Sequence, residues 1–227
     1  MKKSFCLLLV LPLLLCGVFR IRADDTDPIS RMTFFGESTT AHLALRGGID
    51  PARVWSNASG TMKLDSGILS RTLTDHATGQ PDTVTGLAKT YRPDILVLSF
   101  GLNGVMNFSE HPDGYLRNYR KLIDAIRAVS PDTRMVIQSV CPVSDSDHQT
   151  DWRFSVPPDE INRRLSLLND RLRAFCNQDP ALTYVDTASP LTDSAGFLRA
   201  DLTTDGIHLT AAAYRLLLSA LRQGLNA

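Results

Sequence analysis

One short segment constrains the fold more than any other part of this chain. DILVLSF (94–100) is almost wholly apolar and shows no alternation of polar and apolar residues. A strand with one wet face alternates, whereas a parallel strand covered on both faces does not. Four other short runs have strand character, at 31–35, 53–56, 134–140 and 182–187. The sequence therefore predicts a buried parallel sheet.

Segments with helical spacing of apolar residues separate these strands. The clearest are GYLRNYRKLIDAIRAV (114–129), 158–177 and 208–225. Shorter helical segments are expected at 39–45, 64–73 and 83–92. Strand and helix thus alternate, which is typical of an α/β fold with three layers, α/β/α, around a five-stranded parallel sheet. Ligands of such sheets bind beyond the carboxyl ends of the strands.

The first 23 residues indicate export. Two lysines precede a continuous apolar run in MKKSFCLLLVLPLLLCGVF, which is the layout of a secretory signal. The run is short for a membrane span of ~20 residues, but it could serve as an uncleaved anchor. Ala23 is a possible cleavage residue, although Ile21 is larger than such sites prefer. We expect residues 1–23 to be a signal peptide or N-terminal anchor, and residues 24–227 to form the domain, secreted or held outside the cytoplasmic membrane.

Charge and cysteine content bear on partners and compartment. The chain has 24 basic and 24 acidic residues. Nucleic-acid binding needs a basic excess on one face, so we expect no nucleic-acid partner. The predicted domain holds two cysteines, Cys141 and Cys176. They could form one disulfide outside the cytoplasm, or remain two buried thiols.

The candidate nucleophile is Ser38, in FFGESTTAHL (34–43). It follows the first predicted strand through Gly36, so its hydroxyl is expected at the carboxyl end of that strand. A serine becomes a nucleophile only when a base lies within hydrogen-bond reach and a third group orients the base. The alternative is a helix N-cap, a position that serine favours.

The candidate base lies in TTDGIHLT (203–210), just before the last predicted helix. Asp205 and His208 are three residues apart, and in a turn this spacing puts both side chains on one side. The carboxylate can then accept from one ring nitrogen while the other faces outward, which fixes the tautomer of a base. Gly206 permits the bend. The alternative is a histidine near a helix start with Asp205 as its cap.

Two further segments could stabilise an oxyanion. SFGLNGV (99–105) follows the most apolar strand and offers the amide of Asn103, and NASGT (57–61) follows the second strand and offers the backbone N–H of Gly60. Donors aimed at an oxyanion can be worth ~3 kcal/mol each. Both residues could instead serve only as turn formers.

Together these four segments resemble the SGNH (GDSL-type) hydrolase superfamily, whose name lists a serine, a glycine, an asparagine and a histidine in separate blocks. The four correspond here to Ser38, Gly60, Asn103 and His208. The resemblance implies that Asp205 completes a catalytic triad with the serine and the histidine. It also implies an oxyanion hole made by the backbone N–H groups of Ser38 and Gly60 and the side chain of Asn103, and a flavodoxin-like fold. This chemistry needs no metal or organic cofactor.

The resemblance spans roughly residues 31–222, with two departures. Glu37 stands where the family often has an aspartate before the nucleophile, a change expected to affect loop bonding more than chemistry. Gly104 stands where an aspartate often follows the asparagine, which could change how that loop is held. The G-x-S-x-G pattern is not matched, because Thr40 occupies the position of its second glycine, and this argues against the α/β-hydrolase fold.

Other polar and aromatic residues leave alternatives open. His42 could line the pocket or pack within its helix, while His76, His111 and His148 are expected in solvent-exposed turns. His148 with its neighbouring aspartates could suggest a metal ion, although the surrounding loop (141–157) is expected to be flexible. Trp152 and Phe154, in the same loop, could stack on a sugar, hold an acyl chain or fold under the loop.

The sequence therefore predicts an exported serine esterase that acts through an acyl-enzyme on carboxylic esters. Its substrates would be small-molecule or polysaccharide esters, with short acyl chains or O-acetylated carbohydrate as the expected class. One alternative is an acyltransferase, in which a sugar hydroxyl replaces water on the same residues. A second is a non-catalytic glycan-binding module on a hydrolase scaffold, and the complete set of Ser38, Asp205 and His208 speaks against it. The sequence leaves the oligomeric state open.

Overall fold

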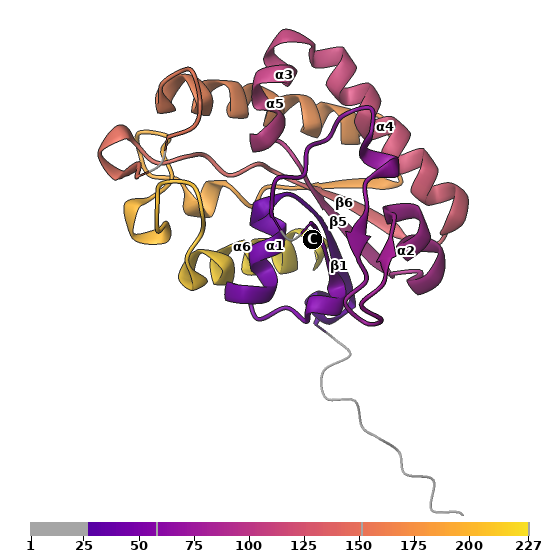
Figure 1. The fold of residues 1–227 in the computed structure, drawn as a ribbon. Helices are drawn as coiled ribbons and strands as arrows, with labels where there is room; N and C mark the ends of the chain where they lie inside the picture. Colours follow the sequence, from indigo (N-terminus) through magenta and orange to yellow (C-terminus); the bar gives the residue numbers. More distant parts are fainter. Residues whose placement is uncertain (1–26, 58, 151, 227) are drawn as a thin grey trace, which may run out of the picture.

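A computed structural model describes residues 27–226, except 58 and 151, so the predicted signal or anchor segment lies outside the described residues. Five parallel strands form the central sheet, in the order β2-β1-β5-β6-β7 (Figure 1). Their bounds are β1 Met32–Gly36, β2 Val54–Trp55, β5 Ile95–Ser99, β6 Arg134–Gln138 and β7 Leu182–Val185. This strand order is flavodoxin-like, and the predicted five-stranded parallel sheet is confirmed.

Helices cover both faces of the sheet (Figure 1). Their bounds are α1 Ser38–Arg46, α2 Val84–Tyr91, α3 Val105–Glu110, α4 Pro112–Val129, α5 Pro158–Asn177 and α6 Ala211–Asn226. The α1 and α6 helices pack on one face, and α2, α4 and α5 pack on the other. None of the helices within the described residues is both long and apolar enough to cross a membrane.

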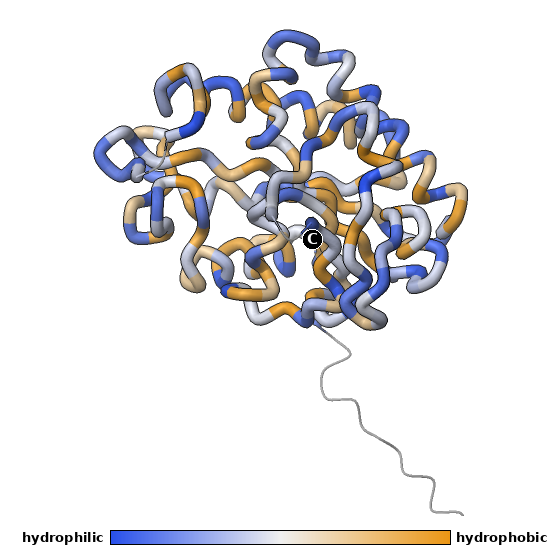
Figure 2. Tube along the Cα trace, in the orientation of Figure 1, coloured by the Kyte–Doolittle hydropathy of each residue, from blue (hydrophilic) through white to orange (hydrophobic). Residues whose placement is uncertain are grey.

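The apolar segment 94–100, which contains β5, has the predicted environment. All five residues of β5 are buried. Leu96 and Leu98 join the core beneath α2, α4 and α5, whereas Ile95 and Val97 join the core beneath α1 and α6. Figure 2 shows the same pattern, with hydrophobic segments along the sheet and hydrophilic ones at the periphery. A strand covered on both faces has no wet side, and this explains why its sequence does not alternate.

Residues 64–73 do not form the helical segment predicted for them. Ile68–Ser70 make one 3-10 turn, and β3 (Leu73–Thr74) pairs antiparallel with β4 (Pro81–Asp82) in a small hairpin. The Asp65 side chain accepts a hydrogen bond from the N–H of Gly67. Such local side-chain bonds compete with helix formation.

The two cysteines and the aromatic pair of the 141–157 loop also have defined places. Cys141 and Cys176 are free thiols, and burial raises the pKa of each to about 12. Trp152 and Phe154 lie with their ring centroids 5.0 Å apart, and both pack against the core. The indole N–H of Trp152 donates to the carbonyl of Val156. The aromatic pair therefore folds under its loop, which was one of the three possibilities left open by the sequence.

Candidate active site

Ser38 begins α1, immediately after the carboxyl end of β1. The N-cap position of this helix belongs to Glu37, so Ser38 does not serve as the cap. The turn is tight, because a Cβ at Gly36 would lie 2.3 Å from the carbonyl oxygen of Ser99 on the neighbouring strand. Glycine at position 36 thus lets the turn between β1 and Ser38 pass close to β5.

A cavity of about 480 Å³ opens beside Ser38. Gly60, His208 and His76 also line it. Ser38, Ala41, His42 and Leu45 recur at the spacing of one helix face, so one side of α1 forms a wall of the cavity. The rest of the lining is apolar at Ala44, Pro51 and Val54 and polar at Ser56, Asn57 and Ser59. The structure thereby brings three of the residues singled out by the sequence, Ser38, Gly60 and His208, to one cavity.

Asp205 and His208 form a close pair next to this cavity. The Nδ1 atom of His208 lies 2.6 Å from Oδ2 of Asp205, while Oδ1 accepts from the backbone N–H groups of Ile207 (3.0 Å) and His208 (2.7 Å). Burial of the carboxyl acts in the opposite direction, but these hydrogen bonds hold the pKa of Asp205 below its usual value. Gly206 adopts φ +89°, so the bend uses a glycine conformation. Because α6 begins only at Ala211, Asp205 is not its cap.

Three contacts fix the His208 segment against α1. The rings of His42 and His208 lie 4.8 Å apart, centroid to centroid. The Arg46 guanidinium donates to the carbonyl of Leu209 (3.0 Å), and the Tyr214 hydroxyl donates to the carbonyl of Thr39 (2.7 Å). These contacts link the helix that carries Ser38 to the segment that carries the imidazole. The sequence predicted neither Arg46 nor Tyr214 as part of the site.

Gly60 packs directly against Ser38. Its φ is +64°, and a Cβ at this position would lie 2.9 Å from Cβ and 3.0 Å from Cα of Ser38. Both the backbone conformation and the close approach therefore require glycine. The N–H of Gly60 donates to the carbonyl of Asn57 at 3.0 Å. To reach a substrate oxyanion, this N–H would have to change or share its acceptor.

Asn103 lies beside Gly60 but is also engaged within the protein. Its Nδ2 atom donates to the carbonyls of Gly60 (3.2 Å) and Met62 (3.0 Å). A side-chain amide carries two N–H donors, and both are used here. The three groups predicted for the oxyanion hole are thus neighbours, while two of them are hydrogen-bonded to other partners.

Glu37 is the polar residue whose importance the sequence understated. Only 4% of it is exposed. Its Oε1 accepts from the N–H groups of Gly101 (3.1 Å) and Leu102 (2.8 Å), and its Oε2 accepts from that of Asn103 (3.0 Å). Loop bonding was expected at this position, but a buried carboxylate with three backbone partners was not.

Residues 149 and 150 donate hydrogen bonds to the backbone of the Asp205 turn. The backbone N–H of Thr150 donates to the carbonyl of Asp205 (3.3 Å). The side-chain amide of Gln149 donates to the carbonyl of Gly206 (3.2 Å). Nearby, Nδ1 of His148 lies 2.6 Å from Oδ1 of Asp145, in a more exposed pair with the same sequence spacing as Asp205 and His208. Asp151 falls outside the described residues. Within 27–226, less 58 and 151, no cluster of three or more His, Cys, Asp or Glu could hold a metal ion.

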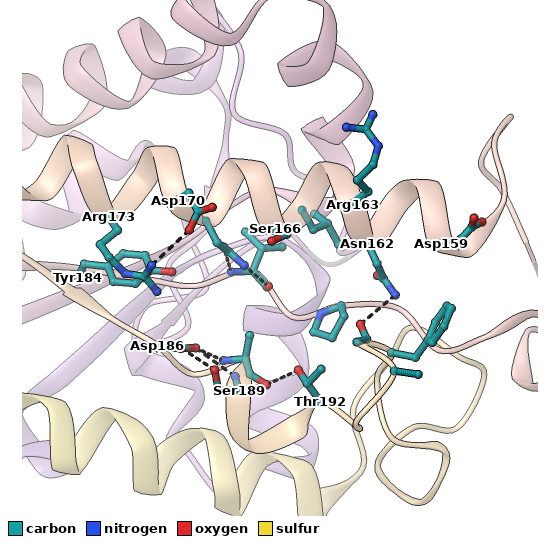
Figure 3. A pocket seen from close by; sticks show the side chains of 18 residues that line it. Asp159, Asn162, Arg163, Ser166, Asp170, Arg173, Tyr184, Asp186, Ser189 and Thr192 are labelled. Carbon is teal, nitrogen blue, oxygen red and sulfur yellow. Dashed lines mark hydrogen bonds and ion pairs between the residues drawn. The ribbon is translucent and has the colours of Figure 1, made fainter.

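A second cavity, of about 450 Å³, contains none of the predicted site residues (Figure 3). It lies between α5 and the segment after β7. Much of its polar lining is already paired within the protein. Asp186 accepts from Ser189, and the Asn162 side chain bonds both backbone groups of Val143. Because Ser38, Gly60 and His208 line the first cavity and none of them lines the second, the first cavity is the better candidate for the chemistry.

Residues 34–216 match the model of the GDSL-like lipase/acylhydrolase family. Solved structures with a similar fold include a GDSL-like lipase from Bacteroides thetaiotaomicron, with 16% identity, a TM-score of 0.57, and 88% of this chain and 89% of that chain covered. A carbohydrate esterase family 3 protein from Talaromyces cellulolyticus has 15% identity, a TM-score of 0.54, and 86% and 95% covered. An acetylxylan esterase from Geobacillus stearothermophilus, solved as a catalytic mutant, has 13% identity, a TM-score of 0.50, and 86% and 93% covered. A search of curated proteins finds no match.

Proposed function

This chain belongs to the GDSL-like lipase/acylhydrolase family and is a serine hydrolase, and from that premise we propose that Ser38, His208 and Asp205 are its catalytic triad. The observation that carries the proposal is the placement of Ser38 and His208 on one cavity, with Asp205 hydrogen-bonded to Nδ1 of the imidazole. That bond leaves Nε2 as the nitrogen that can accept the serine proton. The same carboxylate stabilises the imidazolium that forms.

The reaction proceeds in two steps. In the first, Ser38 attacks the ester carbonyl while His208 takes the hydroxyl proton, and the histidine then delivers this proton to the leaving alcohol. In the second, water, activated by the same imidazole, releases the acid from the acyl-enzyme. The N–H of Ser38, at the first position of a helix, lacks an intrahelical acceptor and is suited to the oxyanion. Gly60 and Asn103 join it by turning from their carbonyl partners toward the developing charge.

The proposed substrates are esters of short acyl chains, with O-acetylated carbohydrate as the favoured class. Two of the structures with a similar fold are named as a carbohydrate esterase and an acetylxylan esterase. The polar side of the cavity includes Asn57 and Ser59, and the Oδ1 atom of Asn57, which has no partner among the described residues, suits a hydroxyl group of a sugar alcohol. Rates on acetyl, butyryl and octanoyl esters of one alcohol test this proposal. A preference for octanoyl would contradict it.

The triad is tested by Ser38→Ala. We expect this variant to fold, to lose turnover of an aryl acetate, and to resist labelling by a fluorophosphonate that modifies the intact protein. His208→Ala should likewise abolish labelling, because the hydroxyl then has no base. Undiminished turnover by Ser38→Ala would remove Ser38 from the mechanism.

The location outside the cytoplasm remains part of the proposal. Its support is the layout of residues 1–23, two lysines followed by an apolar run. Fractionation of cells that express the full chain, with N-terminal sequencing of the exported product, would test both export and cleavage. Recovery only in the cytoplasm would contradict it.

A further inference from the structure

Glu37 is a buried carboxylate that the proposed mechanism does not use. It is joined by the hydrogen bonds described above to three consecutive backbone N–H groups, those of Gly101, Leu102 and Asn103. We propose that Glu37 is a positioning residue whose ionised carboxylate couples the nucleophile turn to the Asn103 loop and thereby sets the place of the Asn103 amide. The inference rests on the proposed roles of Ser38 and Asn103 in the reaction.

The backbone of Glu37 is itself held firmly. Its N–H donates to the carbonyl of Ser99 (3.2 Å), and the Ser56 hydroxyl donates to the carbonyl of Gly36 (2.7 Å). The carboxylate therefore extends from a fixed point, one residue before the nucleophile. Consecutive N–H groups that converge on one anion form a concave binding site for it. In this protein the anion is a side chain, so the loop geometry depends on the charge of Glu37.

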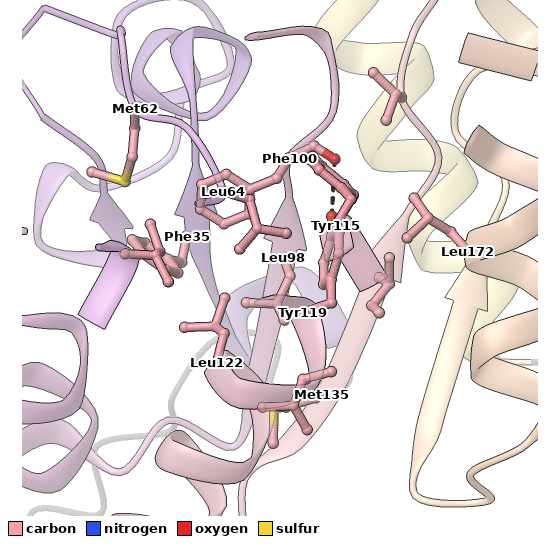
Figure 4. Close-up of a cluster of buried hydrophobic side chains, with 14 of the residues drawn as sticks. Phe35, Met62, Leu64, Leu98, Phe100, Tyr115, Tyr119, Leu122, Met135 and Leu172 are labelled. Atoms are coloured by element: carbon pink, nitrogen blue, oxygen red, sulfur yellow. Dashed lines mark hydrogen bonds between the residues drawn. The ribbon is translucent and has the colours of Figure 1, made fainter. Parts of the chain in front are cut away.

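Two tyrosines of α4 support the loop from below (Figure 4). The Tyr119 hydroxyl donates to the carbonyl of Phe100 at 2.9 Å. The ring of Tyr115 lies so close to Gly104 that a Cβ there would be 2.7 Å from it. An aspartate after Asn103, frequent in the family that the sequence resembles, would therefore meet the ring of Tyr115. The carboxylate that holds this loop comes instead from Glu37.

The environment of Glu37 makes its charge sensitive to pH. Burial raises the pKa of Glu37 to about 7, while the three N–H donors favour the ionised form. The titratable groups that face it are Tyr115 and Tyr119, and burial holds the pKa of both hydroxyls well above the usual value. A protonated carboxyl presents a hydrogen where one of the loop N–H groups needs an acceptor. Protonation of Glu37 therefore loosens the Asn103 loop.

A double-mutant cycle between Glu37→Gln and Asn103→Ala tests the coupling. In the wild-type background we expect Glu37→Gln to lower kcat at pH 8.5 by about 10-fold or more with little change in KM, since the loss is in the transition state. In the Asn103→Ala background the same change should cost no more than about 2-fold, because its target is already gone. Equal costs in both backgrounds, or an unaffected kcat, would overturn the proposal.

The pH dependence gives a readout that a purely structural role would not move. As the pH falls through about 7, kcat of the wild type should drop by about the same 10-fold that Glu37→Gln costs at pH 8.5, because protonation and the substitution remove the same charge, and this step should be absent from Glu37→Gln. Glu110→Gln, an exposed carboxylate on α3, is the matched control and should leave both the rate and the pH step unchanged. If Glu37→Gln does not fold, Glu37→Asp replaces it in the cycle, with the same expected coupling. Loss of turnover in Ser38→Ala combined with an unaffected Glu37→Gln would refute this inference alone.

Discussion

The imidazole rings of His42 and His208 lie 4.8 Å apart, centroid to centroid, with their planes tilted by 56°. His42 is on α1, four residues after Ser38, so the candidate base rests against the helix that carries the candidate nucleophile. Burial lowers the pKa of His42, and charges on His208 and Arg46 lower it further, against the opposite effect of Asp205. The net effect favours the neutral imidazole of His42. We expect the His42 ring to support the orientation of the His208 ring through this contact.

Two replacements of His42, by alanine and by phenylalanine, distinguish a role of the ring in packing from a role of the imidazole in the reaction. We expect His42→Ala to lower kcat about 3–10-fold, the equivalent of the ~0.5–1.5 kcal/mol that an aromatic pair contributes. His42→Phe keeps a ring in place and should stay within about 2-fold of the wild type, since an aromatic contact is preserved. Steady-state kinetics on an aryl acetate measures both. An equally large loss in His42→Phe would contradict a role in packing alone and assign the imidazole a part in the reaction.

Asp205 and Asp145 offer a matched comparison within one chain. Each is three residues before a histidine, and each carboxylate lies 2.6 Å from Nδ1 of that histidine. Only the first pair borders the cavity that contains Ser38. Asp205→Asn should lower kcat by about 10³–10⁴-fold, because the amide cannot hold the tautomer of a base. Asp145→Asn should change kcat by less than about 2-fold, as for most exposed substitutions. Similar losses in both variants would mean that the effect is not catalytic.

The sequence predicted much of the fold, and it singled out Ser38 and His208, which the structure places on one cavity, for identifiable reasons. The continuous apolar run of β5 and the apolar stripes of α4 and α5 are local sequence patterns. They predicted the buried sheet and the helical layers that cover it. Ser38 could be placed because it follows β1, and His208 because it precedes α6. The state of the proposed oxyanion donors could not be predicted, because the acceptor of each depends on how separate loops meet. The Asn103 amide bonds the carbonyls of Gly60 and Met62, 43 and 41 residues away.

The supporting contacts were missed for the same physical reason. Arg46 bonds a carbonyl 163 residues away, and Tyr214 bonds one 175 residues away. Nothing in the local sequence of either residue distinguishes it from other arginines or tyrosines on an amphipathic helix. Glu37 could have been suspected, because a charged residue directly after a buried strand and before the nucleophile must find partners. Its three partners, however, lie 64 to 66 residues away.

Gly60 and Gly48 allow the steric role of glycine to be separated from its backbone role. Both have positive φ, +64° and +71°, but a Cβ at Gly60 would meet Ser38, whereas one at Gly48 would meet nothing within 4 Å. Alanine at either position should lower the free energy of unfolding by about 1–2 kcal/mol, through the left-handed backbone. Only Gly60→Ala should also lower kcat, by at least about 10-fold, because Ser38 must shift from its productive position. Denaturant unfolding and kinetics on both variants give the comparison. Full activity of Gly60→Ala would argue against a tight fit around the nucleophile.

The pKa of Glu37 predicts an unusual dependence of stability on pH. Its value of about 7 in the folded protein exceeds the ordinary 4.5, so the folded state binds the proton more tightly than the unfolded state does. The resulting stabilisation is fully present below about pH 4.5 and is lost as the pH rises through about 7. The free energy of unfolding of the wild type, relative to Glu37→Gln, should therefore fall by about 3 kcal/mol between pH 4.5 and pH 8. Urea unfolding of both proteins at the two pH values measures the difference.

Glu160→Gln is the control, since Arg163 and Arg164 lower the pKa of Glu160 to about 2 and keep it ionised in the folded state at both pH values. A relative stability of wild type and Glu37→Gln that does not change with pH would mean that Glu37 has the same pKa in the folded and unfolded states.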